Sequence, residues 1–196
     1  MFDLECGIRL RAAHTSPGTD YDNIVSLYNN AKVAEYMSYD FPVPQGDSLK
    51  EFFQGIVTKN AEMFCIVETI PQSQGGKDDV EKPRFVGMAA LWVSRRERGH
   101  RHSEFGIGLM PEFWGKGYGK EITKFLIHHG FYHLNLHRIS LETIGGNDRA
   151  ITMYKACGFV EEGRLREAVW VRGGWRDIIV MGILVDEWRE RSLNRD

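Results

Sequence analysis

The sequence predicts an α/β fold of the mixed α+β kind. We expect one domain with a central, twisted mixed sheet of about seven strands and helices on both faces. Three observations lead to this prediction. The 196 residues suit one medium-sized domain. The apolar fraction of 42% and the charged fraction of 27% are ordinary for a globular protein. Segments with strand-like and helix-like periodicity also follow one another along the chain, as in a sheet covered by helices. We therefore treat residues 1–196 as a single domain.

The N-terminal part is expected to form one strand and two helices. Residues 7–13 alternate in polarity, as a strand does. Between residues 20 and 37 the apolar side chains recur at helical spacing, which predicts a continuous helix. Asp47-Ser48 are candidate N-caps of a second helix, because Glu51 stands three positions after Ser48 and completes a capping box.

Three strands separated by two loops are expected next. Residues 63–70 and 84–93 are apolar runs, and the polar, Gly- and Pro-containing segment 71–83 between them predicts a long hairpin connection. Segment 94–103 is a basic loop that could also meet an acidic acceptor or a phosphate, although such charge runs are usually solvated. Residues 103–110 form the third strand.

The C-terminal part alternates helices and strands and ends in a hairpin. The expected elements are a helix at 118–133, a strand at 138–143, a helix at 147–156 and two strands at 159–171 and 175–185. The segment Arg172-Gly173-Gly174 between the last two strands is a hairpin signal. A short charged helix is expected to close the chain.

Composition excludes several functional classes. A net charge of −2 gives no reason to expect nucleic acid or an anionic membrane as a partner. No apolar run has the length of a membrane span, and the N-terminus does not read as a signal peptide. The three cysteines have no metal-binding or redox spacing. We therefore expect a cytoplasmic protein.

A glycine-rich turn is the most informative segment. Gly115, Gly117 and Gly119 follow a strand and open a helix, with Lys116 and Lys120 between and after them. A helix N-terminus offers unpaired N–H groups and partial positive charge, and glycines let the backbone approach an anion closely. The turn therefore predicts a diphosphate site.

The spacing of the turn excludes two common diphosphate sites. A Walker loop requires Ser or Thr after Gly-Lys, whereas Glu121 follows Lys120 here. A dinucleotide fingerprint requires GxGxxG, whereas this turn is GxGxG. A turn that only joins a strand to a helix remains the alternative at this point.

Two segments carry a resemblance that is more specific. Residues 106–121, GIGLMPEFWGKGYGKE, resemble the acyl-CoA-binding motif Arg/Gln-x-x-Gly-x-Gly/Ala of the GNAT (Gcn5-related N-acetyltransferase) superfamily. Gly117 and Gly119 match its glycines, and Trp114 stands where Arg or Gln is usual. Residues 147–159, NDRAITMYKACGF, resemble a second family segment, Asn-x-x-Ala-x-x-x-Tyr-x-x-x-Gly-Phe. The residues around Trp114 resemble those of the branch that contains ribosomal-protein and spermidine N-acetyltransferases.

The resemblance implies acetyl-CoA as cosubstrate and no metal. It also implies a splay between the strand at 103–110 and the next strand, where backbone groups hold the pantetheine arm. The implied cofactor-binding residues are Leu109, Met110, Trp114, Gly115, Lys116, Gly117, Tyr118, Gly119, Lys120 and Asn147. Asn147 is also expected to be the plain N-cap of its helix.

Acetyl transfer to an amine requires a base for the amine and an acid for the departing thiolate. By the resemblance, Tyr154 is the candidate acid and Glu104 the candidate base, with a core tyrosine and a solvated glutamate as the alternatives. Glu142 and Asp177 are weaker candidates, chosen only because they lie on neighbouring strands. No cysteine matches a catalytic position, so we expect direct attack without a covalent acetyl-enzyme.

Several properties stay open in the sequence. His129, His133 and His137 recur every four residues, yet helix-end histidines explain them better than a metal site. A catalytically silent acyl-CoA sensor is the alternative to an N-acetyltransferase. The acceptor could be a protein N-terminus, a polyamine or another small amine, and a homodimer is compatible with the family but not readable here.

Overall fold

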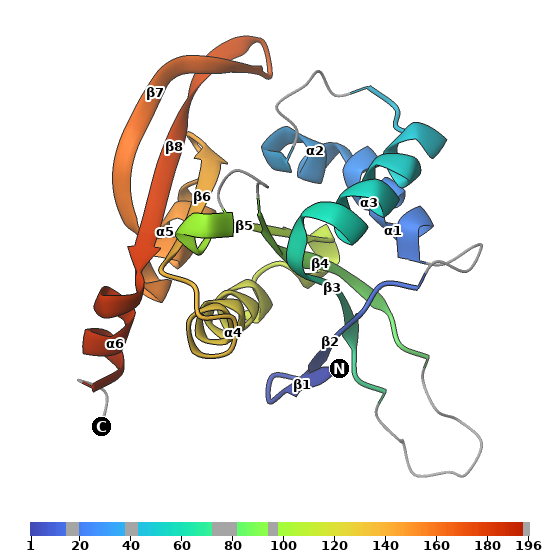
Figure 1. The fold of residues 1–196 in the computed structure, drawn as a ribbon. Coiled ribbons are helices and arrows are strands. Elements are labelled where there is room, and N and C mark those ends of the chain that lie inside the picture. Colours follow the sequence, from blue (N-terminus) through green and yellow to red (C-terminus); the bar gives the residue numbers. More distant parts are fainter. Residues whose placement is uncertain (15–19, 38–42, 72–81, 94–97, 194–196) are drawn as a thin grey trace.

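The computed structural model describes residues 1–14, 20–37, 43–71, 82–93 and 98–193. Within them the strands form one mixed sheet in the order β1-β2-β3-β4-β5-β6-β8-β7 (Figure 1). The strands are β1 (Phe2–Leu4), β2 (Ile8–Arg11), β3 (Ala61–Thr69), β4 (Phe85–Trp92), β5 (His102–Leu109), β6 (Arg138–Ile144), β7 (Val160–Val171) and β8 (Gly174–Leu184). The α-helices are α1 (Asp20–Asn29), α2 (Ala31–Met37), α3 (Asp47–Asn60), α4 (Tyr118–Tyr132), α5 (Asp148–Cys157) and α6 (Val185–Leu193).

Helices cover both faces of the sheet, as predicted. Helices α4 and α5 pack with β4, β5 and β6 around one core, in which Leu91, Leu126 and Ile139 are fully buried. Helices α1, α2 and α3 pack on the other face around a second core that contains Ile24 and Ile66. The mixed α/β prediction is confirmed, except that the sheet has eight strands rather than about seven. The extra strand, β1, is only three residues long and pairs with β2.

The expected helix at 20–37 is two helices, because Asn30 starts a new one. Its side-chain Oδ1 accepts the N–H of Lys32 at 3.1 Å, and its carbonyl accepts the N–H of Ala34 at 2.8 Å. This is the geometry of an N-cap. The apolar periodicity continues across the break, which is why the sequence pattern concealed it.

The expected capping box at the second helix is also wrong. Helix α3 begins after Gly46, and no side chain caps it. Asp47 lies in the first turn instead and forms an ion pair with Lys50 at 3.1 Å. Over the described residues, no helix combines the length and apolar character that crossing a membrane requires.

The two loop predictions fall partly outside the described residues, which omit 72–81 and 94–97. Strands β3 and β4, on either side of segment 71–83, are antiparallel neighbours, and the N–H of Thr69 donates to the Arg84 carbonyl at 2.9 Å, as a hairpin requires. Residues 98–100 of the basic loop form a short 3-10 turn before β5.

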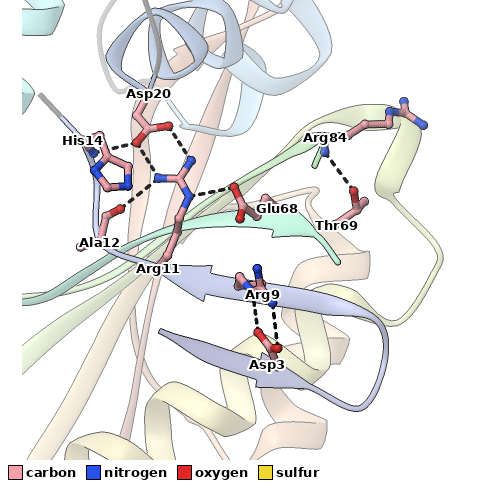
Figure 2. A network of polar contacts seen from close by, with 9 residues as sticks. All are labelled: Asp3, Arg9, Arg11, Ala12, His14, Asp20, Glu68, Thr69 and Arg84. Carbon is pink, nitrogen blue, oxygen red and sulfur yellow. Dashed lines mark hydrogen bonds and ion pairs between the residues drawn. The ribbon is translucent and has the colours of Figure 1, made fainter. Parts of the chain in front are cut away.

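A buried ionic network fixes the start of α1 to the sheet (Figure 2). Arg11, at the end of β2, donates to both carboxylate oxygens of Asp20 at 2.6 and 2.9 Å and to Glu68 on β3 at 2.8 Å. The backbone N–H of His14 also donates to Asp20, whose exposed fraction is only 2%. The bidentate geometry and the additional donor compensate for the burial of the Asp20 charge.

Candidate active site

Strands β5 and β6 separate after a short parallel contact. They pair only from His102 to Glu104, against Arg138 to Ser140. Strand β5 nevertheless stays paired with β4 as far as Leu109. The backbone of β5 beyond Glu104 therefore has no partner strand on its β6 side, which is the splay that the family resemblance implies.

The register decides which backbone groups face this gap. The N–H of Met110 donates to the Val86 carbonyl at 2.8 Å, so Met110 and Val86 form a hydrogen-bonded pair. Because such pairs alternate along an antiparallel ladder, the odd-numbered residues that precede Met110 point their N–H and C=O groups away from β4. These residues include Ile107 and Leu109. Met110, which we expected to bind a ligand through its backbone, uses its N–H within the sheet, and its carbonyl accepts the N–H of Phe113. Ile107, whose backbone groups face the gap, is therefore the candidate in place of Met110.

The glycine turn presents unpaired donors at the N-terminus of α4. Gly115 and Gly117 have φ values of 79° and 84°, which other residues rarely adopt. Within the described part of the chain, the N–H groups from Gly115 to Gly119 have no hydrogen-bond acceptor. Converging N–H groups and the helix dipole make this turn suitable for a diphosphate.

Gly119 has no such backbone requirement, since it lies in the first turn of α4. A Cβ added there would meet Leu109 and Met153 at 3.8 and 3.9 Å, which is ordinary contact. The protein itself leaves room for a methyl group at this position. A ligand that approaches the backbone is the better explanation for glycine here.

The cationic side chains near the turn differ in whether they face the cavity. Lys120 lines the cavity described below, whereas Lys116 does not and its Nζ lies 5.1 Å from the centre of the Phe113 ring. Arg149 was not singled out in the sequence, yet its guanidinium lies 3.4 Å from where a Cβ of Gly115 would stand. It reaches the turn because α5 begins beside it, a proximity that residue spacing alone does not reveal.

Asn147 precedes α5 as predicted, but its side chain makes no capping hydrogen bond. The carbonyl of Asn147 starts the helix by accepting the N–H of Ile151 at 3.0 Å. The expected role of the Asn147 side chain as a plain N-cap is therefore wrong, and the residue lines the cavity.

Tyr154 is 8% exposed and packs edge-on against Phe105 and Phe159. Its hydroxyl has no hydrogen-bond partner among the described residues, and it is not one of their fully buried unpaired atoms. The oxygen must therefore reach the cavity that Tyr154 lines. Burial raises the pKa of the Tyr154 phenol above its usual value, so it keeps its proton at neutral pH.

Two carboxylates lie across the gap from Tyr154. Glu104 pairs with Ser140 in the parallel ladder, so Glu104 and Glu142 point to the same face of the sheet. That face carries α1, α2 and α3, because Trp92, the β4 partner of Glu104, packs in their core. Asp177, by contrast, accepts hydrogen bonds from Arg164 and the N–H of Glu167 and does not line the cavity.

One cavity of about 870 Å³ joins these groups through the gap between β5 and β6. What we call its turn side is formed by the end of β5, the glycine turn and the first residues of α5. What we call its helix side is formed by apolar and aromatic side chains of α1, α2, α3 and β4. These are Tyr28, Val33, Tyr36, Met37, Phe52, Phe53, Ile56, Met88 and Trp92. Sequence periodicity marked several of them only as helix faces.

The histidines do not assemble a metal site in the part of the chain that the structure describes. The ring centroids of His129 and His133 lie 4.8 Å apart at the end of α4. No group of three His, Cys, Asp or Glu side chains in the described ranges could hold a metal ion.

Comparison with known sequences decides the family. The acetyltransferase (GNAT) domain profile matches residues 8–160. This chain belongs to the GNAT family. The chain is thus an acetyl-CoA-dependent N-acetyltransferase that acts on an amine.

Individual relatives share this GNAT domain over most of its length. The spermidine N(1)-acetyltransferase of Vibrio cholerae is 30% identical over 169 residues, which cover 86% of this chain and 90% of the relative. A putative ribosomal N-acetyltransferase of Bacillus subtilis is 32% identical over 104 residues, 53% of this chain and 56% of the relative. The crystal structure of the Vibrio cholerae spermidine N-acetyltransferase in complex with CoA and spermine superposes with a TM-score of 0.74 at 30% identity. That match covers 93% of this chain and 98% of the other.

Proposed function

We propose that this enzyme transfers the acetyl group of acetyl-CoA directly to a primary amine of a polyamine, with Glu104 and Tyr154 as the catalytic residues. The observation that carries the proposal is the single cavity in which an acidic floor, a protonated phenol and a diphosphate-binding turn meet. The residues present fit the cosubstrate, because the turn side offers unpaired N–H donors where a pyrophosphate needs them.

On the turn side, backbone groups hold the cosubstrate in place. The N–H groups from Gly115 to Gly119 bind the pyrophosphate, and Lys120 and Arg149 supply positive charge next to it. Ile107 offers its backbone groups to the pantetheine amides across the gap, and Leu109 offers its N–H to the thioester end of the same arm. Tyr118 and Asn147 line the same side and complete the binding surface, which Trp114 also borders.

In the transfer, acetyl-CoA supplies a thioester whose carbonyl carbon is activated for attack. Glu104 accepts a proton from the ammonium of the acceptor, directly or through water, so that the nitrogen lone pair forms the new N–C bond. The N–H of Leu109 faces the gap and stabilises the growing negative charge on the thioester oxygen. As the C–S bond breaks, Tyr154 donates its proton to the sulfur. The second proton of the attacking nitrogen then passes through water to the Tyr154 phenolate, so amide and free thiol are the products and Tyr154 is protonated again.

Two properties of the helix side favour a polyamine acceptor. Glu104 and Glu142 place two carboxylates at the floor, where an ammonium group would be attracted. The aromatic and apolar walls suit a chain of methylene groups. Relatives from Vibrio cholerae and Escherichia coli are spermidine N(1)-acetyltransferases, which supports the same acceptor class.

A thiol-release assay tests the proposal. The purified enzyme is mixed with acetyl-CoA and spermidine, spermine, putrescine or a short peptide with a free N-terminus, and products are identified by mass spectrometry. We expect thiol release with the polyamines and little with the peptide. Efficient peptide acetylation without polyamine turnover would overturn the acceptor class, and no turnover with any amine, despite CoA binding, would overturn catalysis.

We also propose that the enzyme works in the cytoplasm as an assembly of identical chains. All three cysteines are free, which suits a reducing compartment. The Vibrio cholerae spermidine N-acetyltransferase forms a dodecamer, and β7 is an edge strand here with exposed Val160, Leu165 and Trp170. Analytical ultracentrifugation at several concentrations tests the assembly; a monomer throughout would contradict it.

A further inference from the structure

The indole N–H of Trp114 donates to the carbonyl of Leu109 at 2.8 Å. This contact links the end of β5 to the residue that opens the glycine turn. Leu109 is one of the two residues whose backbone groups face the gap, and its carbonyl is the last one before β5 ends. Trp114 itself is half-buried and packs against the core of the helix side.

The peptide group between Leu109 and Met110 is thereby held at both ends. Its carbonyl accepts the Trp114 indole N–H, and its N–H donates to the Val86 carbonyl at 2.8 Å. Two hydrogen bonds in opposite directions fix the plane of this peptide, and they thereby restrict the torsion angles of Leu109, whose N–H lies in the adjacent peptide.

The bond also changes the electrostatics of the gap. An unpaired Leu109 carbonyl would present partial negative charge where the thioester oxygen becomes negative during transfer. A carbonyl that accepts an indole N–H has that charge partly compensated. What remains at this end of the gap is the Leu109 N–H, which is a donor.

We propose that Trp114 is a positioning residue for acetyl transfer, rather than a side chain that binds the cosubstrate. Its indole N–H orients the end of β5 so that the Leu109 N–H serves the thioester oxygen. The inference rests on the proposed function. It gives a role to the tryptophan that stands where the family pattern has Arg or Gln.

The test compares Trp114→Phe, which keeps an aromatic ring but loses the N–H, with Trp114→His, which can restore a donor. We expect kcat of Trp114→Phe to fall roughly tenfold, the effect of one well-placed hydrogen bond. The KM of the amine and the dissociation constant of CoA, measured by calorimetry, should stay within about twofold, and Trp114→His should recover part of kcat. Trp175→Phe is the control, because Trp175 is 56% exposed on the hairpin and does not line the cavity.

Each outcome is decisive. An unchanged kcat in Trp114→Phe overturns the proposal, and so does a weaker affinity for CoA with kcat preserved, because that pattern belongs to a binding residue. Equal losses in Trp114→Phe and Trp175→Phe also overturn it. If Trp114→Phe does not fold, benzothienylalanine at position 114 keeps the indole shape without the N–H and gives the same comparison. Failure of the wild-type protein to turn over any amine would instead count against the proposed function.

Discussion

The turn side and the helix side of the cavity use different kinds of groups. On the turn side the inward-facing groups include the backbone N–H groups of the glycine turn and the exposed edge of β5. On the helix side they are side chains from three helices and one strand, with carboxylates at the floor. A backbone site tolerates little variation in shape, whereas a side-chain site can change its ligand by substitution.

The two sides also depend on different supports. The turn side is built on β5, α4 and α5, which pack around one continuous core. The helix side depends on α1, α2 and α3. One polar contact fixes the start of α1 to the sheet, and another holds α2 to the β7–β8 hairpin. Arg11 and Asp20 fix the start of α1, and Arg172 from the β7–β8 turn contacts Glu35 on α2. We therefore expect the two sides to respond separately to substitution.

The largest effect is expected from Asp20→Asn, on the helix side. This change removes one partner of a buried ion pair and should lower the free energy of unfolding by about 3 kcal/mol. Urea denaturation measures the loss. Asp3→Asn is the matched control, because Asp3 also forms an ion pair with an arginine but is 51% exposed, and it should change stability little (Figure 2).

The stability that Asp20 contributes should depend on pH in a defined direction. Burial alone would raise the pKa of Asp20, but its hydrogen bonds from Arg11 and the His14 N–H outweigh burial and lower it. A lowered pKa stabilises the fold above the unfolded value of about 4, and this stabilisation disappears as the pH falls through the folded pKa. The difference between wild type and Asp20→Asn should therefore shrink in acid. A difference independent of pH would show that the Asp20 charge is not its source.

The next effect is on catalysis at the turn side. Tyr154→Phe keeps the contacts with Phe105 and Phe159 but removes the acid, so kcat should fall by roughly 100-fold while CoA affinity is retained. Steady-state kinetics and calorimetry measure the two quantities. Because burial raises its pKa, Tyr154 should cause no alkaline loss of activity below about pH 10. Tyr132→Phe, at a tyrosine that is 69% exposed on α4, is the control; equal activity of both variants would assign Tyr154 to packing alone.

The difference between the sides also explains what the sequence could predict. Glycine spacing and helical periodicity encode backbone geometry, so the turn and α5 were accessible from residue types alone. Tyr154 was singled out through the family resemblance, and its burial became known only from the structure. The choice between Met110 and Ile107 was not, because it depends on which β4 residue each one faces. Arg149 approaches the turn only through the packing of α5. The walls of the helix side have the same apolar spacing as a core, so sequence could not separate them from it.

Gly119→Ala is expected to separate ligand binding from stability on the turn side. Alanine favours a helix over glycine, and the space at this position admits its methyl group, so the free energy of unfolding should rise by about 0.5 kcal/mol. The same methyl group should obstruct the approach of the pyrophosphate and weaken CoA binding by about tenfold. Gly55→Ala in α3, where nothing lies within 4 Å of the added Cβ, should leave CoA binding unchanged. Unchanged CoA affinity in Gly119→Ala would mean that no ligand approaches this backbone.

The smallest effect is expected from the ion pair between Glu35 and Arg172, whose charged atoms lie 2.6 Å apart. This contact joins α2 to the tip of the β7–β8 hairpin, which lies near α2 in Figure 1. The Glu35 side chain is 10% exposed and that of Arg172 is 69% exposed, so water and salt weaken the pair and its coupling energy should be about 0.5–1 kcal/mol. A double-mutant cycle with Glu35→Gln and Arg172→Gln measures it.

Because Val33, Tyr36 and Met37 of the same helix line the helix side, each single variant should raise the KM of the amine about two- to threefold and leave that of acetyl-CoA unchanged. The double charge reversal Glu35→Arg with Arg172→Glu should restore the amine KM. An equal rise in both KM values would show that the two sides of the cavity are coupled through α2, and the separation argued above would then be wrong.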